Sequence, residues 1–269
     1  MNAVLAWLLG CGAAILALAI FAVLLLASEV GFRLGRRLTH KIEESEQAIT
    51  ATLTSGMLTL LAFVLGLSIN YAEGRFEARR DLVVTEANAI GTAWLRARLV
   101  ADPEGGAIAN GIREFAQTRL DFTRAKSEAP VEALDIRSNE EADNIWRLTE
   151  EVSRKAPTPI TATLVNALNE MFDSAQAQRF AFLGQTPGPM LDMMMLGSLI
   201  AIGALGYGMG LKGSRQTVLT CLLLLMWTGA MVMAVDLNQP RVGLTHVDTR
   251  PLEWTIRDID QAPPPAPDQ

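Results

Sequence analysis

The sequence predicts an all-α membrane protein, in which a helical extramembrane domain is inserted between the second and third of four transmembrane helices. Half of the 269 residues are apolar, and the mean hydropathy of the chain is positive. Uncharged residues form four long runs, at 3–28, 47–72, 193–211 and 216–235. The polar region between the second and third runs carries apolar residues at helical spacing and shows no strand alternation.

The four uncharged runs have the length of transmembrane helices. About 20 residues cross a hydrocarbon core of ~30 Å at a rise of 1.5 Å per residue, and the runs contain 26, 26, 19 and 20 residues. Four buried helices of a soluble protein would instead carry polar interruptions every turn or two. The first run lacks a basic start and is longer than the ~7–15 apolar residues of a signal peptide. We therefore expect it to remain as a membrane helix.

These runs divide the chain into four parts. We assign residues 1–72 to the first two transmembrane helices and 73–187 to the helical extramembrane domain. Residues 188–236 hold the third and fourth transmembrane helices, and 237–269 form a polar tail. The proline-rich stretch Ala262–Pro267 predicts a disordered end.

The extramembrane domain is predicted to contain four helices. The first continues from the second transmembrane helix, with an apolar stripe at Val83, Ala87, Ile90, Trp94 and Ala97. The turn 102–106 (Asp-Pro-Glu-Gly-Gly) ends it. The apolar positions of the next two helices are Ile112, Phe115, Leu120 and Phe122, then Ile145, Trp146, Leu148 and Val152. Pro157 and Pro159 precede a fourth helix over 160–183.

The third transmembrane segment is rich in glycine, and small residues let membrane helices approach one another closely. Gly206 and Gly210 form one such pair at a spacing of four residues. A packing role for these glycines is favoured over a ligand-binding role. The polar turn Lys212–Arg215 makes the third and fourth segments a hairpin.

The sequence offers no recognisable site for catalysis, metals or nucleic acid. His40 and His246 lack metal-ligand spacing, and Cys11 and Cys221 lie in apolar runs, where a thiol acts as a small apolar group. No hydrolase elbow, phosphate loop, zinc-protease motif or dinucleotide fingerprint is present. No basic run with interleaved aromatic residues indicates nucleic-acid binding. We expect neither an enzyme nor a bound cofactor.

Two stretches carry a family resemblance. The first is the block Phe63–Leu67 (Phe-Val-Leu-Gly-Leu), followed by Arg75–Arg80 (Arg-Phe-Glu-Ala-Arg-Arg) and Glu86–Gly91. The second is the acidic, proline-containing segment Asp236–Arg241 after the fourth membrane run. In these stretches, and in the order of its helices, the chain resembles the bestrophin family, and in particular its bacterial bestrophin-like branch.

The resemblance implies a pentameric anion channel whose pore is lined by the second transmembrane helix. Its neck would be formed by Thr59, Phe63 and Leu67, which the i, i+4, i+8 spacing places on one helix face. Thr59 departs from the large apolar residue usual in the family, and Leu60 replaces a proline. Ordinary helix packing or lipid contact is an equally weighted alternative for Phe63 and Leu67.

Charged residues come after the predicted neck in the sequence. Arg75 of each copy would form a cationic ring at the water-side mouth, which would concentrate anions. A snorkelling interfacial anchor is the alternative for this arginine. We assign Glu77, Arg79 and Arg80 to intrahelical or intersubunit salt bridges.

The functional expectation is an oligomeric chloride-type channel, with membrane lipid, further copies of the chain and small anions as its partners. The alternative is a non-conducting scaffold, or a stress or signalling protein, of the same fold. Asp236, Asn238 and Asp248 are the oxygen ligands nearest to the position where animal bestrophins bind calcium, but six to eight are needed. We therefore predict no metal site.

The expected location is the cell membrane, crossed several times, which is the inner membrane if the source is bacterial. Each side of the membrane has six Lys and Arg residues near the ends of the transmembrane helices. The positive-inside rule therefore does not decide the orientation of the chain in the membrane. The resemblance places the helical domain and both termini in the cytoplasm.

Overall fold

The computed structural model describes residues 12–38, 44–101, 103–126, 128–184, 188–241 and 243–263. These residues form helices joined by turns and short loops, and they contain no strand. The predicted disordered end lies outside the described residues from residue 264 onward, as do Cys11 and His40.

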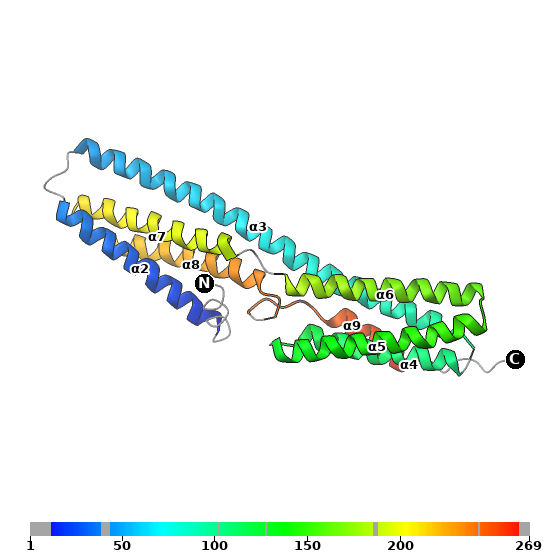
Figure 1. The fold of residues 1–269 in the computed structure, drawn as a ribbon. Helices are drawn as coiled ribbons and strands as arrows, with labels where there is room; N and C mark the ends of the chain where they lie inside the picture. Colours follow the sequence, from blue (N-terminus) through cyan, green and yellow to red (C-terminus); the bar gives the residue numbers. More distant parts are fainter. Residues whose placement is uncertain are drawn as a thin grey trace. The chain divides into compact units, whose positions relative to one another are not determined.

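The helices follow one another along the chain as shown in Figure 1. They are α2 (Ala13–Leu38), α3 (Glu44–Ala97), α4 (Glu104–Arg124), α5 (Glu128–Lys155), α6 (Pro159–Leu183), α7 (Gly188–Leu211), α8 (Thr217–Asn238) and α9 (Arg250–Gln261). Four of them, α2, α3, α7 and α8, are long and apolar enough to cross a membrane. The predicted fold class is therefore confirmed.

The chain divides into two compact units. The first, called the membrane unit below, comprises residues 1–75 and 185–245. The second, the helical unit, comprises residues 76–184 and 246–269. Helix α3 contributes its first part to the membrane unit and its last part to the helical unit.

The membrane unit has its own apolar core. Leu16, Leu24 and Ile202 are fully buried in it, together with Leu224. Many apolar side chains point outward instead, such as Leu18, which is 74% exposed. Outward apolar side chains are expected in a protein surrounded by lipid, because an outward leucine then lies in an apolar medium.

Helices α2 and α7 approach one another through glycines. A methyl group added at Gly31 would overlap the carbonyl oxygen of Gly203, and one added at Gly206 would overlap that of Ser28. Gly210 is blocked in the same way by the carbonyl of Phe32. The backbones therefore come so close that no larger residue fits, in agreement with the packing role expected for these glycines.

The helical unit buries the apolar positions that the periodicity identified. Val83, Ile90 and Ile112 are fully buried, and the rings of Phe115 and Phe172 meet edge to face at 6.0 Å between centroids. Helix α6 begins at Pro159, one residue before the predicted start. The Thr158 hydroxyl caps it by accepting a hydrogen bond from the Thr161 amide in a capping box.

Helix α9 was not predicted, because its residues were assigned to the polar tail. Its buried residues are Leu252, Ile256 and Ile259. It lies beside α4 in the helical unit, where Asp260 pairs with Arg113 and Glu253 pairs with Arg124. The Thr255 hydroxyl also donates to the Ala87 carbonyl at 3.3 Å. The polar tail therefore includes a helix that completes the core of the helical unit.

Candidate ion pathway

The three predicted neck residues lie on an exposed face of α3. Phe63 is 63% exposed, Leu67 is 53% exposed, and Thr59 is exposed as well. Gly66, on the same side of the helix, would have open space around an added methyl group. A single chain therefore leaves this face uncovered over more than two helical turns.

The opposite face of α3 packs into the membrane unit. Leu61 and Leu65 are 8% and 5% exposed and belong to its apolar core, and Ser68 is buried beside them. Their spacing of four and three residues places them on one stripe, because an α-helix turns once in 3.6 residues. Packing of this stripe fixes which side of α3 remains outward, and it is the side that carries the predicted neck.

Thr59 is the polar member of the predicted neck. Its hydroxyl donates to the Ser55 carbonyl, one turn earlier, at 2.9 Å. A threonine that bonds back to its own helix satisfies its donor without any partner chain. Thr59 therefore brings a small side chain to a position where a large apolar residue was expected.

Arg75 lies on a different side of α3. Twelve residues separate it from Phe63, which is a turn of about 120° around the helix axis at 3.6 residues per turn. Its guanidinium carbon lies 6.0 Å from the centre of the Tyr71 ring, and its side chain is half-buried. Its Nε is buried and has no hydrogen-bond partner among the described residues. The structure therefore separates Arg75 from the exposed face of the neck.

The other charged residues of this stretch divide between surface and core. Arg79 is only 1% exposed, and its Nε donates to the Ala181 carbonyl of α6 at 3.2 Å. Glu77 and Arg80 are exposed, and no ion pair joins them within the described chain. Their pairing between subunits stays a prediction.

Asp236, in the segment that carried the second part of the resemblance, organises the loop after α8. Asp236 is 3% exposed, and its carboxylate accepts hydrogen bonds from the amides of Leu244 at 2.7 Å and Thr245 at 3.0 Å. Gly243 has a φ of +139°, and an added methyl group would overlap the same carboxylate. The carboxylate thus has a structural role in closing this loop, and glycine is needed opposite it.

Asp236 and Asp248 do not belong to any group of three His, Cys, Asp or Glu residues that could hold a metal ion, as far as the described residues extend. The Asp248 carboxylate instead pairs with Arg250, which lies two residues further along. The arginine holds the pKa of Asp248 below its ordinary value through a side-chain hydrogen bond and through its charge. The absence of a calcium site remains a prediction.

Sequence reasoning missed a charged cluster in the membrane unit, formed by Glu29, Arg33 and Arg215 with the ring of Phe32. Arg33 and Arg215 are among the six Lys and Arg residues near the membrane ends on their side, and their spacing in the sequence does not indicate that both meet Glu29. A signal was available, because Glu29 directly follows an uncharged run of 26 residues. A carboxylate at that depth needs a cation nearby.

Comparison with known proteins agrees with this architecture. A family model described as a bestrophin-like domain matches residues 5–252. Two crystal structures of a bacterial bestrophin homologue from Klebsiella pneumoniae are similar in fold, with TM-scores of 0.65 and 0.64 and sequence identities of 15% and 16%. The likeness covers 90% and 91% of this chain and 95% of each of theirs. The sequence matches none of the curated proteins with which it was compared.

Proposed function

Since the chain belongs to the bestrophin-like family, we propose that it is an oligomeric ion channel of the cell membrane, with α3 of each copy lining the pore. The observation that carries the proposal is that Thr59, Phe63 and Leu67, which the resemblance assigns to the neck, lie together on an uncovered face of α3. Phe63 and Leu67 are more than half exposed there. In an assembly of several copies around an axis, such a face is covered by its own symmetry mates. Five copies are what the family resemblance implies.

The neck of this pore is formed by Thr59, Phe63 and Leu67. A ring of Phe63 side chains makes an apolar constriction, which can stop ions by expelling water. The Thr59 side chains of the copies form a ring of smaller side chains one turn away. We therefore assign the narrowest point of the pore to Phe63 rather than to all of Thr59–Leu67.

The resemblance implies small anions as the permeant species, with Arg75 as the residue that concentrates them. A half-buried Arg75 near the mouth supports this function through its field, since a cation need not touch the ion path to attract anions.

A second candidate function is a cation-permeable channel, and one specific observation favours it. Glu77 follows Thr59 by five helical turns, and Asp81 follows Phe63 by the same distance. Both carboxylates are exposed, whereas Arg75 lies about 120° from Phe63 around the helix. Rings of Asp and Glu are typical of cation pores.

The first experiment is ion flux from liposomes that contain the purified oligomer, with chloride and potassium measured in parallel. We expect flux in the wild type and a higher flux for Phe63→Ala, because the constriction becomes wider. Leu225→Ala is the matched control, since Leu225 is 62% exposed on α8 and lies outside the proposed pore. Equal flux for Phe63→Ala and Leu225→Ala would refute the assignment of Phe63 to the pore neck. Silent vesicles that hold folded oligomers would favour the non-conducting scaffold.

Reversal potentials across a salt gradient decide between the two candidates. An anion channel is expected to lose anion preference in Arg75→Glu and to keep its selectivity in Glu77→Gln. A cation channel is expected to lose cation preference in Glu77→Gln, while Arg75→Glu leaves the preference for cations in place. Selectivity that changes in neither variant would place the filter elsewhere.

A further inference from the structure

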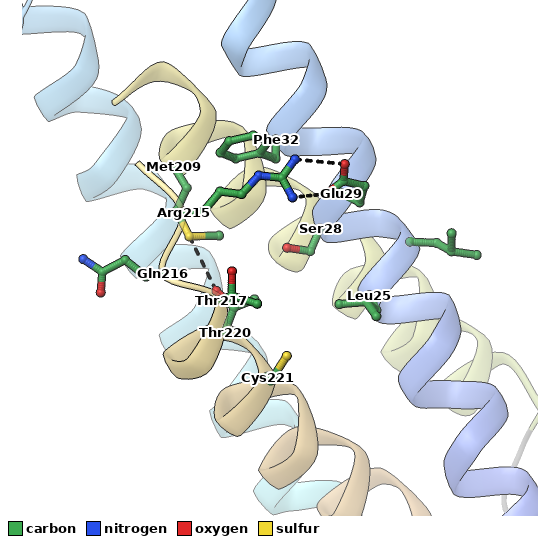
Figure 2. Close-up of a pocket in the computed structure, with 11 residues that line it drawn as sticks. Leu25, Ser28, Glu29, Phe32, Met209, Arg215, Gln216, Thr217, Thr220 and Cys221 are labelled. Atoms are coloured by element: carbon green, nitrogen blue, oxygen red, sulfur yellow. Dashed lines mark hydrogen bonds and ion pairs between the residues drawn. The ribbon is translucent and has the colours of Figure 1, made fainter. Parts of the chain in front are cut away.

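A cavity of about 340 Å³ opens between α2 and α8 in the membrane unit. This volume lies within the range of ~300–1,000 Å³ usual for small-molecule sites. Figure 2 shows its two ends: the charged residues Arg215 and Glu29 lie beside Phe32 at one end, and Leu25 and Cys221 face one another at the other. The cavity is therefore amphipathic along its length.

The charged end belongs to a cluster with a net positive charge, in which Glu29 and Arg215 line the cavity and Arg33 lies outside its lining. The Glu29 carboxylate pairs with the Arg33 Nε at 2.7 Å and with the Arg215 guanidinium at 3.1 Å. Two cations on one carboxylate leave a net charge of +1. Arg215 also lies over the Phe32 ring at 4.2 Å, which fixes its position, and its side chain remains 53% exposed. It can thus meet a ligand while it holds Glu29.

The beginning of α8 adds hydrogen-bond donors at the same end. Gln216 and Thr217 line the cavity there, whereas the Thr220 hydroxyl, further along α8, donates to the Met209 sulfur at 3.5 Å. The Gln216 side chain makes no capping hydrogen bond at the start of the helix. The first amide groups of a helix have no acceptor within it and carry a partial positive charge. These amides support the arginine as partners for an anion.

The other end of the cavity belongs to the hydrocarbon region. Leu25 and Leu26 lie in the uncharged run 3–28 and are 40% and 65% exposed. Cys221 completes this end from α8, and it also lies in an uncharged run. From Leu25 to Phe32 the helix rises about 10 Å at 1.5 Å per residue, so the cavity extends from the interface into the bilayer.

We propose that this cavity binds an anionic glycerophospholipid. The phosphate is held by Arg215 and the start of α8, and an acyl chain lies along Leu25, Leu26 and Cys221. A net positive end at the interface beside an apolar end in the bilayer matches the two halves of such a lipid. A zwitterionic phospholipid gains less at the charged end, because its headgroup carries a cation as well.

The test is a titration of the purified oligomer with phosphatidylglycerol or phosphatidylcholine, in which bound lipid is counted by native mass spectrometry. We expect phosphatidylglycerol to bind more tightly to the wild type. Arg215→Gln should weaken its binding about fivefold, since one basic residue near a headgroup contributes on that scale. Lys212→Gln is the matched control: it removes one charge from the same hairpin but lines a different cavity, and it should bind as the wild type does.

Glu29→Gln supplies the opposite change. It raises the net charge of the cluster from +1 to +2, so we expect phosphatidylglycerol to bind more tightly than in the wild type by a similar factor. A purely structural ion pair would make both Arg215→Gln and Glu29→Gln less stable, with no dependence on the headgroup. Opposite signs in these two variants therefore identify a lipid site.

Photolabelling locates the bound lipid. A phosphatidylglycerol with a diazirine in its acyl chain should label residues around Leu25 and Cys221. The proposal is overturned if labelling falls elsewhere, or if a second copy of the chain covers the cavity and prevents labelling. Displacement of the lipid by soluble glycerol phosphate at equal concentration would also overturn it, because the site would then bind a free anion. Equal binding of the two lipids to the wild type would have the same consequence.

Discussion

At the residue scale, the dominant feature of the helical unit is a buried ion pair. Glu86 of α3 is fully buried and accepts a hydrogen bond from Arg119 of α4, which is 2% exposed. Arg119 also donates to Gln178 and to the Ala175 carbonyl of α6, and it lies 4.5 Å from the centre of the Phe122 ring. One guanidinium thus joins three helices, so the loss of its partner leaves a charge with no water to stabilise it.

Glu86→Ala should therefore destabilise the protein strongly. Removing one partner of a buried pair costs about 3–5 kcal/mol, which corresponds to a loss on the order of 10 °C in Tm. The measurement is thermal unfolding of the full chain in detergent. Glu150→Ala is the control, because it breaks the exposed pair with Arg154 and should cost less than ~1 kcal/mol. Equal shifts in the two variants would contradict this account.

A second prediction at this scale concerns the stability of helix α9 at low pH. The pKa of Glu253 is held below its ordinary value, first by a hydrogen bond from the Thr249 hydroxyl and then by Arg124. A carboxylate whose pKa is lowered on folding stabilises the fold above its ordinary pKa and loses this effect as pH falls through the lowered value. We expect hydrogen exchange in 250–261, corrected for intrinsic rates, to increase as the pH falls below 4.5.

Glu253→Gln is the matched variant for this measurement. It removes the titrating group, so the pH-dependent part of the exchange in α9 should become smaller while the helix stays docked through Leu252, Ile256 and Ile259. The effect is small, because the pair is partly exposed and screened by solvent. An unchanged pH dependence in this variant would show that another group opens α9.

At the element scale, the contact between α2 and α7 depends on the absence of side chains. Gly206→Ala adds the one carbon that would overlap the Ser28 carbonyl. Overpacking of this kind costs about 1–3 kcal/mol, and we expect a lower Tm and a smaller fraction of monodisperse protein. Gly229→Ala adds the same carbon on α8, where nothing lies within 4 Å. Alanine favours a helix more than glycine does, so Gly229→Ala should not lower the Tm. A similar loss in both variants would contradict the role of the contact with Ser28.

The helices themselves could be predicted because their signals are local. The stripe from Val83 to Ala97 and the prolines before α6 each depend on neighbours within a few turns. Helix α9 also carries such a signal, with Leu252, Ile256 and Ile259 at spacings of four and three. Its five charged residues lower its mean hydropathy, so that by composition it resembles a polar tail. Periodicity, rather than mean hydropathy, would have identified it.

Partners across the chain could not be predicted from local patterns. Nothing near Glu86 indicates Arg119, because 33 residues separate them. Nothing near Gly206 indicates Ser28. The face of α3 that carries Phe63 is a similar case: spacing predicted that Thr59, Phe63 and Leu67 share a side, but only the packing of Leu61 and Leu65 fixes that side as the outward one. The position of Arg75 is different, because its spacing of twelve residues from Phe63 already places it about 120° away around the helix.

At the scale of the whole molecule, the uncovered face of α3 is expected to lie against the same face of other copies of the chain. Leu67→Cys in a cysteine-free background should form crosslinks between subunits when a short bismaleimide is added to membranes, because symmetry brings the same position of each copy around one axis. The measurement is the ladder of bands on denaturing gels, for which five copies are expected. Leu225→Cys on α8 should give none. Ladders of equal strength from both positions would show that α3 does not line the symmetry axis of the assembly.

The close contact of α2 with α7 has a consequence for how the protein is made. Gly31 and Gly203 are 172 residues apart in the sequence, and ribosomes add about 5–20 residues per second. Helix α2 therefore waits in the membrane for roughly 10–30 s before its partner helix is synthesised. During that time Glu29 lacks Arg215, and a strip of backbone lies open to any other helix nearby. This surface of α2 is thus open to wrong partners until α7 is made, and we expect a factor that covers it during insertion to raise the yield of folded protein.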